Sequence, residues 1–200
     1  MKRTILSLVA LLMAAAMNAQ TAVSVLDKAS AEYKKSQSVT AEFEINLGGN
    51  IDNGTILLQG TKFRTTTSES TIWFDGKTMW TYMKDNEEVN VTEPSATQLA
   101  KINPYAFLNM YKKGYDVAFG GNTSAYYEVI LTAKGSNASI QKAIIRINKG
   151  TYQPRYIMMG TSRADIEISI KSYKAGGKQA DTAFRFDKKK YPKVDVIDLR

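Results

Sequence analysis

The sequence predicts an α+β fold that is mostly β: one large antiparallel sheet, curved and half closed, with helices on one of its faces. Two observations lead to this prediction. A single helical pattern at the front of the chain is followed by about a dozen short segments in which apolar and polar residues alternate, separated by polar turns. No internal repeat, low-complexity segment or linker divides the chain, so we expect one domain.

The first nineteen residues have the order of a secretory signal peptide. Lys2 and Arg3 precede an apolar run over residues 5–16, and small or polar residues follow up to Ala19. The run is shorter than the ~20 apolar residues that span a bilayer. We therefore expect residues 1–19 to be cleaved and residues 20–200 to form a single exported domain. Loss of Lys2 and Arg3 lowers the formal net charge from +8 to +6.

The front of the exported domain is predicted to be a helix followed by strands. Residues 23–36 should form an amphipathic helix, because apolar residues recur there at helical spacing with charges between them. The period changes to two over residues 39–47, which predicts a strand with one apolar face. A glycine-rich turn is expected at 48–54. Further strands are predicted at residues 55–59, 62–68, 71–74, 78–83 and 88–92.

Helices interrupt the strands in the middle of the chain. Ser95 is predicted to cap a short helix over residues 95–102. Asn103-Pro104 should begin a second helix, with Asn as the cap and Pro at the first helical position, and Gly114 should end it. The remaining strands are predicted at residues 115–119, 125–133, 139–148, 155–160, 165–173, 182–186 and 194–199.

The composition excludes several classes of chemistry. Because the chain contains neither Cys nor His, it has no disulfide, thiol nucleophile, thiolate metal site or Ser-His-Asp triad. None of the sequence motifs for serine nucleophiles or phosphate-binding loops occurs either. Ser, Thr, Lys, Asp and Glu remain as possible catalytic groups, so the composition does not exclude every enzyme. With none of these motifs present, we expect a protein that is not an enzyme, with no catalytic residue, no metal ligand and no cofactor.

The charged clusters have ordinary explanations. Asp165 and Glu167 share a strand face, which alternation in a solvated strand explains better than a catalytic pair. The lysine run at 188–190 can contact phosphate or lipid headgroups, but we interpret it as a solvated turn, because such runs are mostly exposed. The other basic residues are spread along the chain, so no nucleic-acid partner is expected. The positive charge suits an anionic membrane surface or a membrane-bound partner better.

Aromatic and flexible apolar side chains gather near the first hairpins. They are Phe63, Trp73, Phe74, Met79, Trp80, Tyr82 and Met83. Each of them alone is best explained as an ordinary core residue. However, a sheet this wide with only three short helices can leave part of its concave face uncovered, and apolar side chains around such a gap would line a ligand cavity.

At these residues the sequence resembles a known family. The matching motifs are Lys62-Phe63-Arg64, the hairpin from Trp73-Phe74-Asp75-Gly76 to Trp80-Thr81-Tyr82, Asn103-Pro104-Tyr105, Val129-Ile130-Leu131-Thr132-Ala133-Lys134 and Phe184-Arg185-Phe186. Their order and spacing resemble the periplasmic carrier of outer-membrane lipoproteins, the LolA family. The resemblance implies an incomplete, half-open antiparallel β-barrel, with the N-terminal helix and short central helices forming a lid over an apolar cavity.

The resemblance also implies a function and a site. The protein would be a monomeric periplasmic chaperone that takes acylated lipoproteins from an inner-membrane lipoprotein-releasing ABC complex and delivers them to an outer-membrane acceptor. The alternative is a relative with the same fold that binds another apolar ligand, or senses envelope lipids or lipoproteins for signalling. The residues expected to form the acyl-chain cavity are Phe43, Ile45, Leu47, Phe63, Trp73, Met79, Trp80, Tyr82, Tyr105 and Leu108.

One departure from the family concerns the control of the lid. The family's best-known members carry an Arg before the strand that contains the Phe, and this Arg hydrogen-bonds to lid carbonyls. Here the matching position is Gln59 or Gly60, and neither supplies a guanidinium group. Arg64 is nearby but is not the same position. We therefore expect Gln59 or Arg64 to be the candidates for lid control, and the lid to be held differently or more loosely.

Overall fold

The computed structural model describes residues 21–103, 105, 111–161 and 164–200. The expected signal peptide and Leu108 lie outside these residues, as does most of the second helix expected after Asn103. Within the described part of the chain, no helix is both long and apolar enough to cross a membrane.

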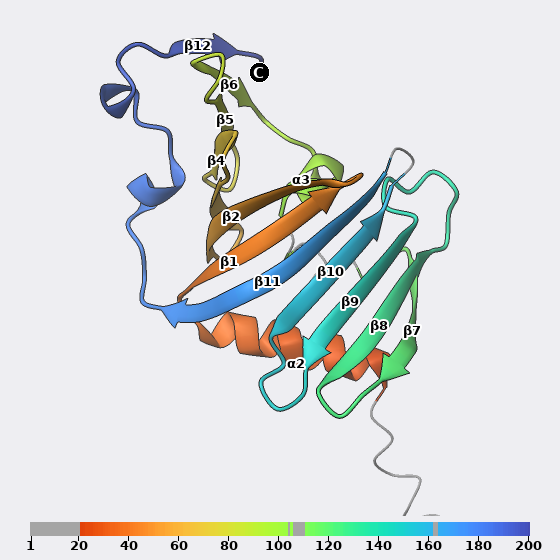
Figure 1. Cartoon of the computed structure of the whole chain (residues 1–200). Coiled ribbons are helices and arrows are strands. Elements are labelled where there is room, and N and C mark those ends of the chain that lie inside the picture. The colour runs from red at the N-terminus through yellow and green to blue at the C-terminus, as the bar shows by residue number, and fades with distance from the viewer. Residues whose placement is uncertain (1–20, 104, 106–110, 162–163) are drawn as a thin grey trace, which may run out of the picture.

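Twelve strands form one continuous sheet, in the order β12-β6-β5-β4-β3-β2-β1-β11-β10-β9-β8-β7 (Figure 1). Neighbouring strands are antiparallel except β12 and β6, which run parallel. The sheet curves but does not close, so β12 and β7 are its two edges. The strands are β1 Ser38–Leu47, β2 Asn50–Gln59, β3 Lys62–Thr66, β4 Ser70–Phe74, β5 Met79–Met83, β6 Glu88–Thr92, β7 Tyr115–Asn122, β8 Tyr126–Ala133, β9 Lys142–Asn148, β10 Pro154–Gly160, β11 Asp165–Gly176 and β12 Asp195–Asp198.

Helix α2, Ala22–Lys35, lies across one face of the sheet, which we call the inner face (Figure 1). The side chain of Thr21 caps it by accepting a hydrogen bond from the Ser24 amide at 3.1 Å. Val25 and Leu26 are fully buried in the main core cluster, together with inner-face strand residues such as Leu58 and Ile145. Burying each such side chain contributes about 1.5–3 kcal/mol, so α2 and the inner face stabilise each other.

The described lid consists of α3, Ala96–Ile102, followed by Asn103, Tyr105 and residues 111–114. The Ser95 hydroxyl accepts a hydrogen bond from the Gln98 amide, and the Gln98 side chain accepts one from the Ser95 amide. This capping box confirms the predicted start of the helix.

After β11, the chain crosses the opposite, outer face of the sheet before β12 joins β6 (Figure 1). Residues 182–186 were predicted to be a strand, and that prediction is wrong: Asp181–Phe184 form the 3-10 helix η2. The segment crosses a face of the sheet rather than following an edge, so its backbone meets no strand with which to pair. Phe184 is fully buried instead. Lys188–Lys190 form a second 3-10 turn, η3, and all three lysines are exposed, as predicted for a solvated turn.

The first hairpin is longer than predicted. The turn expected over residues 48–54 is limited to Gly48 and Gly49, whose φ angles of 59° and 96° favour glycine. Strand β2 begins at Asn50 and pairs with β1 from Asn50 to Leu58, with Gly54 opposite Phe43. The sequence did not predict this extension, because Asn50, Asp52 and Asn53 are poor strand formers, and pairing with β1 overrides their local preference.

Replacing Gly54 by Ala should destabilise the fold by about 1–3 kcal/mol, because the added Cβ would overpack this contact. The Cβ would lie 2.5 Å from Phe43 Cζ and 2.7 Å from the Thr66 carbonyl oxygen. Urea unfolding measures the effect. Gly135→Ala is the control, since a Cβ at Gly135 meets nothing within 4 Å. Equal stability of the two variants would contradict the close packing of Phe43 on Gly54.

Candidate functional site

A cavity of about 750 Å³ lies between the inner face of the sheet and the lid, and we call it the lid cavity. Phe63 of β3 and Phe74 of β4 line it from the sheet, with ring centroids 5.4 Å apart. Leu99, Ala100 and Tyr105 line it from the lid. This volume is in the range of sites that enclose small molecules, and a mostly apolar wall favours an apolar ligand.

Helix α2 supplies the third wall of the lid cavity through Ser30, Tyr33 and Lys34. The Tyr33 hydroxyl donates a hydrogen bond to the Gly60 carbonyl at 2.9 Å, which ties the helix to the turn between β2 and β3. The Tyr33 ring stacks on Tyr105 of the lid at a centroid distance of 5.7 Å. An aromatic contact of this kind stabilises a closed arrangement by about 0.5–1.5 kcal/mol.

The tyrosines at the cavity stay uncharged at neutral pH. Burial, with a smaller contribution from Tyr173, raises the pKa of Tyr33 to about 12. Burial, with smaller contributions from Tyr173 and Tyr33, raises the pKa of Tyr105, which is 4% exposed, well above its usual range. The wall that these rings form therefore presents no negative charge to an apolar ligand.

A second contact joins the lid to α2. The Tyr111 hydroxyl donates a hydrogen bond of 2.6 Å to the Asp27 carboxylate, across 84 residues of sequence. Burial and this hydrogen bond raise the pKa of Tyr111 above its ordinary value. Next to Tyr111, the exposed side chains of Lys112 and Lys113 join Lys34 at the mouth of the cavity.

The structure brings some of the predicted cavity residues together. Phe63 and Tyr105 line the lid cavity, while Phe43, Ile45 and Met79 belong to or pack on the same core cluster. Leu47 lies at the end of β1 and is 49% exposed. The assignment of Leu108 to the cavity remains a prediction, since that residue lies outside the described part of the chain.

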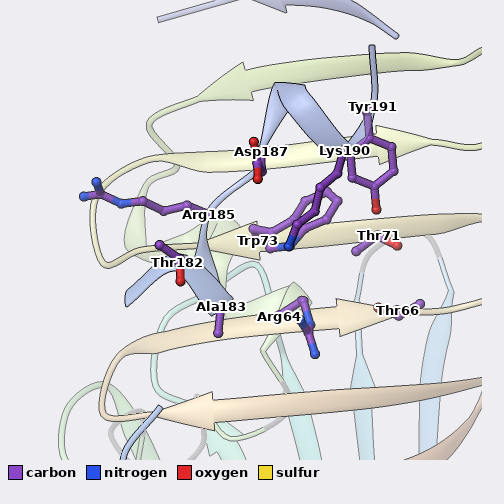
Figure 2. Close-up of a pocket in the computed structure, with 10 residues that line it drawn as sticks. All are labelled: Arg64, Thr66, Thr71, Trp73, Thr182, Ala183, Arg185, Asp187, Lys190 and Tyr191. Carbon is purple, nitrogen blue, oxygen red and sulfur yellow. The ribbon is translucent and has the colours of Figure 1, made fainter. Parts of the chain in front are cut away.

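Trp73, Trp80 and Tyr82 lie on the outer face, away from the lid cavity. Strand register sets this arrangement, because Trp73 pairs directly with Trp80 on β5 and with Arg64 on β3, whereas Phe63 pairs with Phe74. Directly opposite residues share a face, and consecutive residues do not. Trp73 packs instead against Phe186 and Tyr191 of the C-terminal segment, which Figure 2 shows in part. Trp80 and Tyr82 pack on a second core cluster, formed by Val89, Val91 and Val194.

Neither predicted lid-control residue hydrogen-bonds to the described lid. Gln59 exchanges hydrogen bonds with Gln179, whose amide donates to the Gln59 side chain at 2.7 Å. Arg64 lies on the outer face beside Trp73. The described lid is held instead by the Tyr33–Tyr105 and Tyr111–Asp27 contacts, which sequence reasoning missed. The apolar spacing that placed Tyr33 on the buried face of α2 was the only available signal for either contact.

No group of three or more acidic residues that could hold a metal ion occurs among the described residues, in a chain that has no His or Cys. The site is an apolar cavity covered by a lid, and noncovalent contacts hold that lid in place.

A match to a protein-family model places this chain in a lipoprotein-carrier family. The family model described as outer membrane lipoprotein carrier protein LolA matches residues 12–164. An uncharacterized conserved protein from Thermus thermophilus shares the fold, with a TM-score of 0.60 and 10% identity over 87% of this chain and 96% of that chain. A LolA superfamily protein from Nitrosomonas europaea has a TM-score of 0.46 and 16% identity, over 84% of this chain and 99% of that chain. No curated protein matches the sequence.

Replacing Tyr111 by Phe should loosen the lid, because it removes only the hydroxyl that donates to Asp27. A loss of about 1 kcal/mol is expected for a hydrogen bond in this partly exposed setting, which corresponds to a roughly fivefold increase in lid opening. Hydrogen exchange of the backbone amides of α3 and residues 111–114 measures it. Tyr156→Phe is the matched control, since it removes a similar hydrogen bond to Glu167, formed at 2.9 Å. Unchanged exchange at the lid in Tyr111→Phe would contradict the role of this contact.

Proposed function

Since this chain belongs to the family of outer membrane lipoprotein carrier proteins (LolA), we propose that it carries lipoproteins from the inner to the outer membrane, with their acyl chains in the lid cavity. The observation that carries this proposal is the apolar cavity of about 750 Å³ between the inner face and the lid. Phe63, Phe74 and Leu99 provide the apolar contacts that an acyl chain needs.

The physical need for such a cavity follows from the cost of exposing acyl chains to water. Each methylene group kept out of water is worth about 0.8 kcal/mol, and a lipoprotein carries many of them. A lipoprotein therefore leaves a membrane only when another apolar environment receives its chains. The flexible side chain of Met79, which packs on the inner-face core, can adapt to chains of different shape.

The proposed transport uses binding alone and no enzymatic step. Loading needs the lid to open, and the contacts of Tyr111 with Asp27 and of Tyr33 with Tyr105 are noncovalent and reversible. Release needs an acceptor that binds the acyl chains more tightly than the cavity does. The partners proposed for these two steps are an inner-membrane lipoprotein-releasing ABC complex and an outer-membrane acceptor.

The proposed site of action is the periplasm, which the chain would reach as a monomer after cleavage of residues 1–19. The charged, apolar and small-residue order of that segment supports export. The net charge of +6 that remains favours encounters with anionic membrane surfaces.

Replacing Phe63 by Glu should abolish lipoprotein binding, because it places a carboxylate in the apolar cavity wall. Phe63 is fully buried, so the substitution can also unfold the protein. Leu99 lines the same cavity from the lid and is half-buried. Leu99→Glu therefore tests the cavity and leaves the sheet core intact. Affinity purification from envelope extracts, followed by mass spectrometry, measures co-purifying acylated proteins. Phe119→Glu is the control, because Phe119 is 40% exposed on β7, the edge strand at the far end of the sheet from β3 and β4.

Both cavity variants should lose the acylated proteins, while Phe119→Glu and the wild type keep them. Equal recovery from Leu99→Glu and the wild type would rule out the lid cavity as the binding site. Recovery of free lipid without acylated protein from the wild type would refute lipoprotein transport and favour a relative that binds another apolar ligand.

A further inference from the structure

A second pocket, of about 420 Å³, lies on the outer face of the sheet, and we call it the outer-face pocket (Figure 2). Strands β3 and β4 form one side of it, and the C-terminal segment over residues 182–191 forms the other. Because the sheet separates it from the lid cavity, the two pockets share no lining residue.

Aromatic packing fixes the two sides of the outer-face pocket relative to each other. Trp73 of β4 is only 6% exposed, and its ring lies 5.9 Å from that of Tyr191 and 5.7 Å from that of Phe186. Tyr191 also packs on Tyr82 of β5 at 5.1 Å. The pocket is therefore a built feature of the fold and not a gap between mobile side chains.

Two positive side chains in this pocket have no ion-pair partner in the described part of the chain, although the Asp187 carboxylate lines the same pocket. The side chains of Arg64 and Lys190 form no ion pair or hydrogen bond with any described residue. Lys190 and Arg64 line the pocket together with Trp73, and Arg64 lies opposite Trp73 on the neighbouring strand (Figure 2). The acidic residue of the pocket, Asp187, caps η3 by accepting a hydrogen bond from the Lys189 amide at 3.0 Å.

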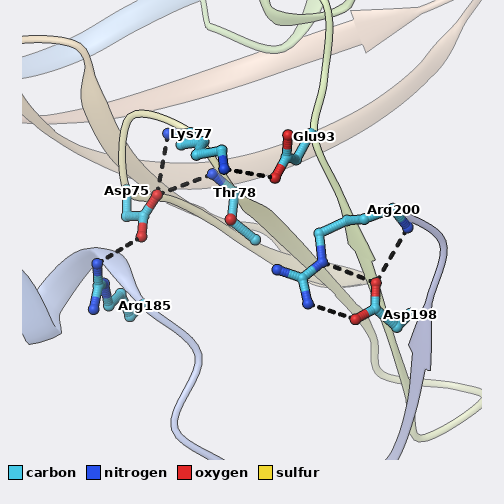
Figure 3. A network of polar contacts seen from close by, with 7 residues as sticks. All are labelled: Asp75, Lys77, Thr78, Glu93, Arg185, Asp198 and Arg200. Atoms are coloured by element: carbon cyan, nitrogen blue, oxygen red, sulfur yellow. Dashed lines mark hydrogen bonds and ion pairs between the residues drawn. The ribbon is translucent and has the colours of Figure 1, made fainter.

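The third cation of the pocket, Arg185, is already neutralised. Its guanidinium group pairs with the Asp75 carboxylate at 3.0 Å, as Figure 3 shows. Burial alone would raise the pKa of Asp75, but hydrogen bonds from the Thr78 and Lys77 amides, together with Arg185, lower it. Asp75 is therefore ionised at neutral pH and holds Arg185 away from Arg64 and Lys190.

We propose that the outer-face pocket binds a phosphoryl group through Arg64 and Lys190. A guanidinium group and an ammonium group are the side chains that most often recognise phosphate. The hydroxyls of Thr66, Thr71 and Tyr191 also line the pocket and add neutral donors around the same space, and Figure 2 shows the Tyr191 hydroxyl directed toward Thr71. Donors from several directions suit the tetrahedral oxygens of a phosphoryl group. The ligand is a soluble phosphate ester or the headgroup of an anionic phospholipid.

Calorimetric titration of the purified protein tests the site with two probes, glycerol 3-phosphate and vesicles containing phosphatidylglycerol, with phosphatidylcholine vesicles as a blank. Arg64→Gln/Lys190→Gln should weaken binding by about tenfold or more, because both charge-assisted contacts are lost. Lys142→Gln/Lys174→Gln is the matched control, since both lysines are exposed strand residues outside the pocket and the net charge changes equally. Thr71→Val should weaken binding severalfold without any change in charge.

Saturable binding of glycerol 3-phosphate with this pattern supports a soluble ester as the ligand. Binding of phosphatidylglycerol vesicles alone, with the same pattern, supports a lipid headgroup. Absence of binding to both probes would overturn the proposal, and so would equal weakening in the pocket and control double variants. Lipoprotein recovery should be the same in the wild type and Arg64→Gln/Lys190→Gln, so this test is independent of the lid cavity.

Discussion

The alternation of side chains across one unbroken sheet is the constraint on which the rest of this structure depends. The side chain of each strand residue points to either the inner or the outer face of the sheet. The register then determines which residues of the neighbouring strands lie on the same face. Phe63 therefore faces the lid cavity, while Arg64, its neighbour in sequence, faces the outer-face pocket. Two sites of opposite character, one apolar and one cationic, result from a single hairpin because a sheet has two faces and each is covered by a different part of the chain.

The sequence was sufficient to predict the class of fold and most strand positions, because alternation and turn residues are local signals. Residues 182–186 show the limit of that signal. Their apolar alternation is that of a strand, but a strand also needs a partner, and the position of the chain relative to a free sheet edge is a tertiary property. The extension of β2 to Asn50 is the opposite case, in which a partner strand overrides unfavourable local propensity.

Sequence reasoning identified part of the candidate site, but it assigned residues from both faces of the sheet to one cavity. Trp73 and Phe74 are adjacent in a family motif, and a motif does not record which of two consecutive side chains faces the cavity. Assigning the face needs the register between β3, β4 and β5, which the turn lengths determine. The contact between Tyr111 and Asp27 could not be predicted for a different reason, because nothing local in the sequence indicates a contact across 84 residues.

The position of β11 beside β1 has a consequence for how the chain folds. The pairing joins Glu42 to Ser172, which are 130 residues apart, and it lies in the middle of the sheet rather than at an edge. Strands β1 to β6 can pair with their neighbours in sequence as soon as they are made, and so can β7 to β11. The two halves meet only when the long loop between them closes, which is an entropically costly and slow step. Until then β1 presents an unpaired edge to solvent, so the interval before β11 docks is when this protein is most exposed to aggregation.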